Sequence, residues 1–506
     1  MSGDGKARPS PGDAEAQRED AAAQRGDYER LRGELARLLG DEHVLGPGDR
    51  GLAPYEVDAT GARGLRGRPD LVVRPGSAQE VAAVLALCYE RELPLIARGG
   101  GTGLAGGAVA LQGGVVCSLE RLRAVRSLEP GLWRMHIEAG LSTRHVQRLA
   151  RENGLFFPPD PGAAEQSQIG GNVATNAGGP HAFKYGVTGN WVTGLEVALA
   201  PGELVQVGGP YRKDVGGYDI KSLLVGSEGT LGIVTAVQLA LLPAPEAALP
   251  LIAFQRSRQD GCAAILDVLA AGVRPAALDF VDGAALRFAA HAWAGGDIDL
   301  PTGAEFALLA EVDGTREQAR AAHAELAAAL GPHAIELRRP DREALWQWRD
   351  RIAGAVAAVR GGKVSEDVVV PVERLVQALE GFAQIAARHG LQACAWGHAG
   401  DGNVHANLLV DPRETAQLQA AAAATDELFA LAAGLGGAIS GEHGVGLLKC
   451  GQLARQWPRR ALELHEEIKA VFDPKGLLNP GKKLARAHPV PPSGLSAPRR
   501  ATLARS

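Results

Sequence analysis

The chain has 506 residues, 46% of them apolar and 22% charged, which is typical of a globular protein of about two to three domains. A net charge of −5 argues against a basic surface of the kind that binds nucleic acid. The five cysteines form no Cys-x-x-Cys pair, which argues against an iron–sulfur cluster or structural zinc site and favours a reducing, cytoplasmic setting.

The first elements expected along the chain are a tail, a helix and a strand–helix pair. Residues 1–26 are rich in glycine, proline, alanine and charge without an apolar period, which predicts a disordered tail. Residues 28–39 predict a short amphipathic helix. A strand is expected at 70–74, and Ser77 with Glu80 three residues later predicts the start of a second helix.

A strand expected at residues 93–97 leads into a glycine-rich stretch, RGGGTGLAGG, at 98–107. It contains the G-x-G-x-x-G spacing of dinucleotide-binding proteins, but that fingerprint requires a helix directly afterwards. Residues 108–119 instead hold a Gly-Gly pair and an apolar run, which predict a turn and a strand. The stretch is therefore either a plain hairpin or a loop of backbone N–H groups that surrounds a pyrophosphate without a helix.

Two further small-residue segments have the same character, IGGNVATNAGG at 169–179 and GSEGTLGIVT at 226–235, and a rigid turn, PPDPG, precedes them at 158–162. We expect loops at these positions, the last one leading into a strand, with backbone that a planar ring can approach closely. Three glycine-rich segments in one part of the chain predict a single extended, flat and anionic ligand. FAD fits that description.

The strongest signal of chemistry is WGHAGDGNVHAN at residues 396–407. His398 and His405 stand on either side of a Gly-Asp-Gly turn. His405 and Asn407 are two apart in a strand expected at 404–410, so their side chains share one face. The turn can bring His398 back towards that face.

A second polar segment, ISGEHGVG at residues 439–446, holds Glu442 and His443 between glycines. Together with His398 and His405, Glu442 completes a set of two imidazoles and one carboxylate. Such a set commonly binds a catalytic divalent metal with an open coordination position. The alternative is that these are ordinary turn histidines.

The glycine-rich motifs and PPDPG, in this order, resemble the FAD domain shared by flavoproteins of the vanillyl-alcohol-oxidase type. The later motifs SEDVVVP, GHAGDGNVH, SGEHGVG and FDPKGLLNPGK are similar to those of FAD-linked 2-hydroxy-acid dehydrogenases. This branch contains the catalytic subunit of glycolate oxidase, D-lactate dehydrogenase and D-2-hydroxyglutarate dehydrogenase. The resemblance covers roughly residues 50–485.

The resemblance implies an α+β architecture of two domains. A two-subdomain FAD-binding domain of the PCMH type is expected over residues 27–243. A cap domain with an antiparallel sheet and helices, of the FAD-linked oxidase C-terminal type, is expected over 246–484, with 472–482 returning to the flavin. A second disordered tail is expected at 485–506. Within the cap, the sequence itself predicts two strands and an Ala-rich helix, at residues 251–254, 306–312 and 316–330.

The resemblance also implies where FAD is held. The glycine loop contains no histidine, so non-covalent FAD is expected. The expected contacts lie in the small-residue segments and in the NPG turn near the end: Arg98, Gly99, Gly100, Gly101, Thr102, Gly103, Pro159, Asp160, Gly170, Gly171, Asn172, Ala174, Asn176, Gly178, Gly179, Gly229, Ile233 and Asn479.

Oxidation of a 2-hydroxy acid requires a hydride acceptor, a base for the hydroxyl proton and a clamp for the carboxylate. We expect Zn²⁺, Mn²⁺ or Fe²⁺ at His398, His405 and Glu442, with His443 as the base. Asn407 is expected to donate a hydrogen bond to the substrate or to support a ligand. Arg349 matches the family's carboxylate-binding arginine, and the alternative is an ordinary arginine on the surface of a helix. Asp367, in the motif SEDVVVP, could equally be a structural residue.

The hydroxyglutarate branch has a Lys-Tyr pair where this chain has Ser365-Glu366, which favours glycolate or D-lactate as the substrate. Two alternatives stay open: a flavin oxidase of another alcohol with a vestigial metal motif, and a non-catalytic FAD subunit. No apolar run reaches the ~18 residues of a membrane span, so at most a peripheral membrane association is expected. The electron acceptor is expected to be a protein or a quinone, and the chain to be a homodimer or a subunit of a complex.

Overall fold

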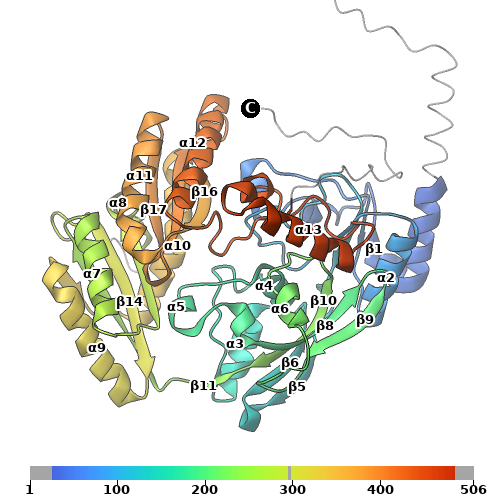
Figure 1. Cartoon of the computed structure of the whole chain (residues 1–506), viewed down its shortest axis with the longest axis horizontal. Helices are drawn as coiled ribbons and strands as arrows, with labels where there is room; N and C mark the ends of the chain where they lie inside the picture. Colours follow the sequence, from blue (N-terminus) through green and yellow to red (C-terminus); the bar gives the residue numbers. More distant parts are fainter. Residues whose placement is uncertain (1–25, 294–297, 485–506) are drawn as a thin grey trace, which may run out of the picture.

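The computed structural model describes residues 26–293 and 298–484, so both predicted tails lie outside the described residues, apart from Gly26. Gly26 begins a helix over residues 26–39, which agrees with the predicted amphipathic helix. Figure 1 shows two groups of elements side by side, with the smaller sheets on the right and a large sheet flanked by long helices on the left.

A small sheet carries the glycine-rich loop between two of its strands. Its elements are β1 (Val44–Leu45), β2 (Leu71–Val73), α2 (Ala78–Glu90), β3 (Leu95–Arg98) and β4 (Val115–Ser118). Among the described residues the strand order is β1-β2-β4-β3, and β4 runs parallel to both β2 and β3. The Ser77 hydroxyl accepts the Glu80 backbone N–H at 3.2 Å, so α2 begins where the sequence predicts.

The glycine-rich loop connects β3 to β4 directly, without the helix that a dinucleotide fingerprint requires. Residues 99–114, all of them described, form bends and turns, with Gly101, Gly106, Gly113 and Gly114 at positive φ. The prediction that this is not a Rossmann unit is confirmed.

A second, antiparallel sheet follows. Its elements are β5 (Val125–Glu129), β6 (Arg134–Glu138), α3 (Thr143–Glu152), β8 (Val192–Leu199), β9 (Glu203–Gly208) and β10 (Ile233–Ala240), and a separate pair consists of β7 (Leu155–Phe156) and β11 (Leu242–Pro243). The order is β5-β6-β10-β8-β9 within the described chain. Three short helices lie between these strands, α4 (Ile169–Thr175), α5 (Ala182–Tyr185) and α6 (Ile220–Leu224).

The helix α4 corrects one expectation, because residues 169–175 were expected to be a loop. The helix contains the pair Gly170-Gly171. Close packing requires glycine at position 170, because a Cβ there would lie 2.7 Å from the Ala139 side chain. The helix ends at Asn176, which adopts a left-handed conformation with φ 52°. Composition alone therefore predicted an irregular segment where tertiary packing holds two helical turns.

The large sheet is antiparallel throughout. Its strands are β12 (Ala247–Gln255), β13 (Ala277–Asp282), β14 (Phe306–Gly314), β15 (Glu336–Arg338), β16 (Gly362–Val369), β17 (Gln392–His398) and β18 (Asn403–Val410). The described strands are ordered β15-β12-β14-β13-β17-β18-β16. The expected strands at 251–254, 306–312 and 404–410 are confirmed as parts of β12, β14 and β18.

Helices cover both faces of this sheet. They are α7 (Arg258–Ala270), α8 (Gly283–Ala289), α9 (Arg316–Leu330), α10 (Arg342–Arg360), α11 (Leu375–Arg388) and α12 (Thr415–Gly434). One apolar core joins α7, α9, α11 and α12 to one face, and another joins α8 and α10 to the opposite face. Successive residues such as Phe280 and Val281 belong to opposite cores, as the two-residue period of a strand requires.

The end of the chain returns to the first sheet. Helix α13 (Arg459–Phe472) lies over β10 and the small sheets rather than over the large sheet (Figure 1). The backbone N–H of Leu95 in β3 donates to Leu477, and Leu95 accepts from Asn479. Residues 477–479 therefore lie beside the strand that leads into the glycine-rich loop.

Candidate active site

One end of the large sheet carries a row of polar side chains on the face shared with α8 and α10. Antiparallel pairing sets Asp279 of β13 opposite His398 of β17, and His405 of β18 opposite Asp367 of β16. His405 and Asn407 share this face, as the sequence predicted. The turn between β17 and β18 places His398 beside His405, with ring centroids 5.2 Å apart.

Glu442 reaches the two histidines from the segment that follows α12. Its Oε1 lies 3.4 Å from the Nε2 atom of His398 and 3.4 Å from the Nε2 atom of His405. One donor atom from each of these three residues lies within 4.8 Å of the others. The donor set, two imidazole nitrogens and one carboxylate oxygen, has the composition of an open divalent-metal site.

Asp279 orients His398. Its Oδ1 atom lies 2.7 Å from Nδ1 of His398, which leaves the Nε2 atom directed towards Glu442. Its other oxygen accepts from Nε of Arg349 at 2.7 Å. A carboxylate behind a ligating histidine is a common support of metal sites. The sequence analysis did not name Asp279, although a lone acid in the apolar strand sequence ALDFVD is a visible signal.

The protonation preferences of the cluster differ strongly from those in water. Burial lowers the pKa of His405 to about 3, so its imidazole is neutral. Burial also disfavours a charged His398, but Asp279 and Glu442 outweigh it and raise the pKa of His398 to about 10. Burial disfavours a charged Glu442 too, yet the histidines lower its pKa to about 2. A cation bound here therefore replaces a proton on His398.

Asp367 fixes the loop that carries Glu442 and His443. Its Oδ2 atom accepts the backbone N–H groups of Gly441, Glu442 and His443 at 2.9, 3.0 and 2.9 Å, and the Ser440 hydroxyl at 2.9 Å. Although burial disfavours its charge, His443 and Lys449 hold the pKa of Asp367 well below its usual range. This geometry supports the structural alternative that the sequence left open for Asp367.

Glu228 fixes the same loop from the glycine-rich side. Its carboxylate accepts the backbone N–H groups of Val445 and Gly446 at 2.9 and 2.7 Å. Glu228 has φ 56°, a strained conformation for a residue with a Cβ, and Asn479 donates to its carbonyl at 2.6 Å. Sequence reasoning named Gly229 and missed Glu228, because the contact joins positions more than two hundred residues apart.

His443 is the most exposed histidine of the cluster. Its side chain is 16% exposed, compared with 4% for His398 and 6% for His405. Its ring stacks on His405 at 5.2 Å between centroids. Asp367, His405 and His443 form a second donor group within 4.8 Å, but the Asp367 oxygens already accept five hydrogen bonds, from Ser440, the three backbone groups and Asn403.

Arg349 and Asn407 lie beside the cluster, Arg349 through its bond to Asp279 and Asn407 two residues from His405 on β18. Arg349 projects from α10, and its buried Nη2 atom has no hydrogen-bond partner among the described residues. Asn407 is fully buried, donates to the His405 carbonyl at 2.7 Å and accepts from Lys363 Nζ at 2.6 Å. The unpartnered guanidinium nitrogen is available to an anionic group, which fits a carboxylate clamp.

The glycine-rich loop presents backbone without side chains at several positions. A Cβ on Gly103 or Gly171 would meet no atom within 4 Å, whereas one on Gly100 would lie 2.0 Å from the Gln166 carbonyl oxygen. Gly100 is thus required for packing, and Gly103 and Gly171 leave room above the backbone. Arg98 donates to the Pro54 and Val57 carbonyls at 2.9 Å each, so its side chain supports the loop from behind.

Polar side chains hold the other small-residue segments in place. Asp160 accepts the backbone N–H of His181 at 3.2 Å, Asn172 donates to the Thr143 hydroxyl at 2.6 Å, and Asn176 accepts the Gly189 backbone N–H at 2.8 Å. A Cβ on Gly178 would lie 2.7 Å from Oε2 of Glu442. The 169–179 segment therefore reaches the polar cluster itself. The bare backbone and the cradle of short side chains fit a flat cofactor beside the histidines.

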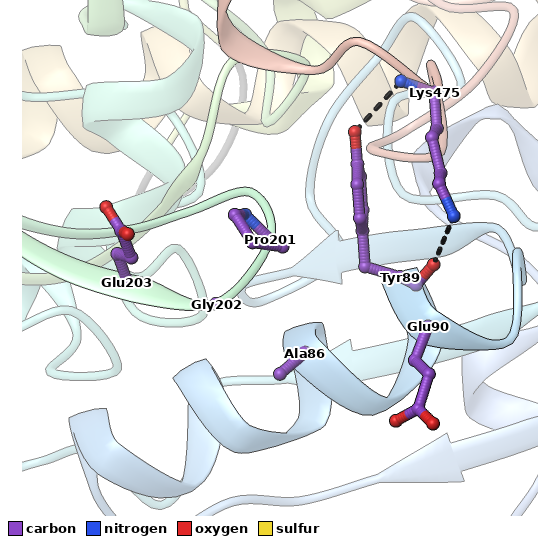
Figure 2. Close-up of a pocket in the computed structure, with 7 residues that line it drawn as sticks. All are labelled: Ala86, Tyr89, Glu90, Pro201, Gly202, Glu203 and Lys475. Atoms are coloured by element: carbon purple, nitrogen blue, oxygen red, sulfur yellow. Dashed lines mark hydrogen bonds between the residues drawn. The ribbon is translucent and has the colours of Figure 1, made fainter.

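A cavity of about 430 Å³ adjoins the cluster. It lies between the 440–446 loop and the glycine-rich side, and Asn176, Glu228, Ser440, Glu442 and Lys469 are among its lining residues. A second hollow, drawn in Figure 2, lies between α2, the Pro201–Gly202 turn and Lys475, whose backbone N–H donates to the Tyr89 hydroxyl at 2.9 Å. It contains none of the candidate site residues, so the cavity beside Glu442 is the relevant one.

Comparison with known families decides what kind of protein carries this site. Residues 69–208 match the FAD binding domain family, and residues 244–483 match the C-terminal domain family of FAD linked oxidases. The chain is 35% identical over 441 residues to the glycolate oxidase subunit GlcD of Bacillus subtilis, covering 86% of this chain and 93% of that protein. The chain belongs to the FAD-linked oxidase family. The implied cofactor, FAD, agrees with the glycine-rich segments described above.

Other relatives place this FAD-linked oxidase in the same group. The GlcD subunit of Escherichia coli K12 is 34% identical over 456 residues, with 88% of this chain and 90% of that protein covered. A D-lactate dehydrogenase of Anaerostipes hadrus is 34% identical over 430 residues, with 82% and 90% covered. The resemblance to the glycolate oxidase and D-lactate dehydrogenase branch, predicted from the motifs, is confirmed.

Solved structures confirm the predicted fold class. A structure of p-cresol methylhydroxylase with substrate bound has a TM-score of 0.76 at 17% identity, covering 91% of this FAD-linked oxidase and 97% of that chain. A 4-ethylphenol oxidase from Gulosibacter chungangensis has a TM-score of 0.73 at 20% identity, covering 90% and 97%. At this identity the likeness establishes the α+β fold and nothing about the substrate.

Proposed function

We propose that this flavoprotein oxidises a small D-2-hydroxy acid to the corresponding 2-oxo acid, with glycolate and D-lactate as the first candidates. The observation that carries the proposal is the cluster of His398, His405, Glu442 and His443 beside a guanidinium nitrogen of Arg349 that no described residue hydrogen-bonds. The names of the relatives, glycolate oxidase subunit and D-lactate dehydrogenase, support the same reaction class.

Two bound groups would supply the reactive chemistry. FAD, once bound at the glycine-rich segments, supplies the acceptor for the hydride that leaves Cα. His398, His405 and Glu442 would hold a divalent cation, with Zn²⁺, Mn²⁺ or Fe²⁺ as candidates, which would supply a positive charge that lowers the pKa of the substrate hydroxyl. The neutral His405, the carboxylate of Glu442 and the Asp279 support behind His398 suit that task.

The side chains around the cluster then divide the remaining work. Arg349 binds the substrate carboxylate through its free Nη2 atom, while its Nε atom stays anchored on Asp279. His443 accepts the hydroxyl proton at its ring nitrogen, because it is the most exposed histidine of the cluster and lies next to the ligand Glu442. Asn407 lies on the same sheet face as His405 and donates a hydrogen bond to the His405 backbone carbonyl. Through its hydrogen bonds it positions either the substrate or the metal ligand His405.

The electrons must then leave the flavin for a partner. We propose a protein or a quinone as the acceptor, and the chain as a homodimer or a subunit of a complex. None of the helices formed by residues 26–293 and 298–484 combines the length and apolar character needed to cross a bilayer. A cytoplasmic or peripheral location is proposed from the free cysteines among the described residues, which suit a reducing compartment.

An anaerobic titration tests the proposal. Addition of glycolate or of D-lactate to the yellow holoprotein is expected to bleach the flavin, whereas L-lactate is expected to do so far more slowly. Bleaching only by other alcohols would contradict the substrate class, and failure of every alcohol to reduce the flavin would favour a non-catalytic FAD subunit.

A further inference from the structure

The cavity beside Glu442 has room that the reaction described above does not use. Glu442 lines this cavity of about 430 Å³, whereas Arg349, Asn407 and His443 do not. Among the expected FAD contacts, only Asn176 lines it. The cavity therefore approaches the cluster from a side that is not assigned to the substrate or to FAD, and it leaves space for a third molecule.

Part of the cavity wall is flat and apolar. Leu223 of α6 and Ile468 of α13 line it, and Figure 1 shows these two helices next to each other. Trp457 and His465 also line it, with their rings stacked at 4.3 Å between centroids and 16° between planes. A cavity of this size suits a small organic ligand, and a wall of stacked rings favours a planar one.

Two polar side chains add hydrogen-bonding groups to this wall. The Nδ1 atom of His465 lies 2.7 Å from the Ala461 carbonyl oxygen, which only accepts, so Nδ1 carries the proton and Nε2 is the acceptor of a neutral ring. Lys483, whose Nζ atom lies 3.5 Å from Oε1 of Glu228, adds an ammonium donor. A donor and an acceptor beside flat apolar walls suit a planar ring whose oxygen atoms are carbonyls before reduction and hydroxyls after it.

The elements at the edge of the cavity expose large apolar side chains. Val215 and Tyr218, in the segment before α6, are 98% and 95% exposed. On α13, Leu464 and Val471 are 44% and 77% exposed. Exposed apolar groups around a cavity are typical of surfaces that contact lipid, a ligand or another protein. They favour a ligand with an apolar tail over a hydrophilic one.

The cavity also adjoins the segment that is expected to lie against the flavin. Asn176 lines it, and a Cβ on Gly178 would lie 2.7 Å from Oε2 of Glu442, which lines it too. The cavity and the 169–179 segment thus share residues and contacts. A molecule in the cavity is therefore close to a flavin held by that segment, as electron transfer between the two requires.

We propose that this cavity binds a quinone that reoxidises the flavin. The proposal rests on the proposed function for the source of the electrons, and it selects a quinone from the two acceptor classes named there. Reduced FAD gives two electrons and two protons to the quinone, whose two carbonyl oxygens become hydroxyl groups, and FAD returns to its oxidised state. The alternative is a protein that takes up the electrons at the surface.

Anaerobic reoxidation of the reduced holoprotein tests the proposal. The flavin is first reduced with dithionite, so the measurement does not depend on any 2-hydroxy acid. The reduced protein is then mixed with decylubiquinone or with ferricyanide, a hydrophilic reference acceptor, and the return of flavin absorbance is followed. In the wild-type protein the rate is expected to saturate with the concentration of decylubiquinone, because a binding site becomes filled.

The variants assign this site to the cavity. Trp457→Ala removes the aromatic wall, and Leu223→Asp places a charge on the apolar wall. Each is expected to lower the second-order rate constant for decylubiquinone, relative to that for ferricyanide, by about 10- to 100-fold. Trp133→Ala is the control, since Trp133 is 40% exposed and does not line the cavity. It is expected to leave the ratio of the two rate constants unchanged.

Two results would overturn the proposal. A rate that rises linearly with quinone concentration in the wild-type protein would show collision without a site, and it decides the matter even where Trp457→Ala fails to fold. Saturation that is the same in Leu223→Asp and Trp457→Ala as in the wild-type protein would place the quinone elsewhere. If 2-hydroxy acids fail to reduce the flavin while quinone reoxidation behaves as expected, the proposed function fails and the quinone site stands.

Discussion

At the scale of single residues, the account depends on four side chains of one small cluster, three as metal ligands and one as a base. His398, His405 and Glu442 share the geometry of ligands, while His443 is more exposed, stacks on His405 and is not a member of that donor group. His443 is therefore the residue whose role a substitution can separate most sharply from metal binding.

His443→Asn is expected to slow flavin reduction by ~10²–10⁴-fold, the usual effect of removing a general base. FAD and metal content are expected to stay at the wild-type level. Rapid-mixing kinetics of flavin reduction, with metal analysis of the same samples, makes the measurement, and His333→Asn on the surface, where His333 pairs with Asp267, is the control. A wild-type rate would remove His443 from the mechanism, and loss of the metal would make it a ligand.

Sequence reasoning reached these four residues because their signals are local. Two histidines around a Gly-Asp-Gly turn and a Glu-His pair between glycines are readable without a fold. Asp279 and Glu228 could not be recognised in this way. Asp279 matters because strand register puts it behind His398, and Glu228 because it caps a loop from another part of the chain.

At the scale of elements, the 440–446 loop is the part that the fold must position most accurately. Asp367 accepts its three central backbone N–H groups, and Glu228 accepts the two that follow Gly444. The loop is therefore bound to the large sheet at one end and to the glycine-rich side at the other. Satisfied N–H groups on a buried loop restrict Glu442 to a narrow range of positions.

Asp367→Asn tests this anchoring. The amide replaces one accepting oxygen with a donor that faces donor groups, so we expect a loss of about 1–3 kcal/mol in the free energy of unfolding. Metal content is expected to fall as well, because Glu442 is no longer held. Chemical denaturation and metal analysis check both. Asp411→Asn, which removes a surface carboxylate bound to Arg413, is the control, and equal metal content in both variants would contradict the anchoring role.

The elements themselves were partly foreseeable. The helix α9 occupies residues 316–330 as expected, since an Ala-rich amphipathic run without glycine determines its own structure. The helix α4 was not foreseen, because its Gly-Gly start is unfavourable in isolation and is stabilised by packing against Ala139. The division of the chain near residues 243–246 stays a prediction, although separate sheets lie on either side of it.

At the scale of the whole molecule, a cluster of charges joins the glycine-rich side to the large sheet. His181, next to α5, lies 2.6 Å from Asp160 and 3.2 Å from Glu311 of β14. Arg342 binds the same Glu311 at 2.7 Å, and the Trp346 indole donates to it at 2.7 Å. The cluster fixes the two halves relative to each other, and thus fixes the distance between the flavin segments and the histidines.

This contact predicts a specific dependence of stability on pH. Burial disfavours a charged His181, but Asp160 and Glu311 outweigh it and raise the pKa of His181 to about 10, above about 6.5 in the unfolded chain. The stabilisation is therefore fully present below about pH 6.5 and is lost as the pH rises towards 10. The thermal midpoint of the wild-type holoprotein is expected to fall over this pH window, and the thermal midpoint of His181→Gln is expected to fall much less. Parallel curves for the two proteins would contradict the prediction.

The central claim is that His398, His405 and Glu442 bind a metal on which flavin reduction depends. The direct measurement is the anaerobic rate of flavin reduction by a 2-hydroxy acid, together with metal content, in the wild-type protein, in protein depleted of metal by a chelator, and in His405→Ala. We predict about one divalent ion per wild-type chain. In both metal-deficient samples we predict retained FAD and a rate that is lower by at least about 10²-fold. Full metal content and a wild-type rate in His405→Ala would contradict the account.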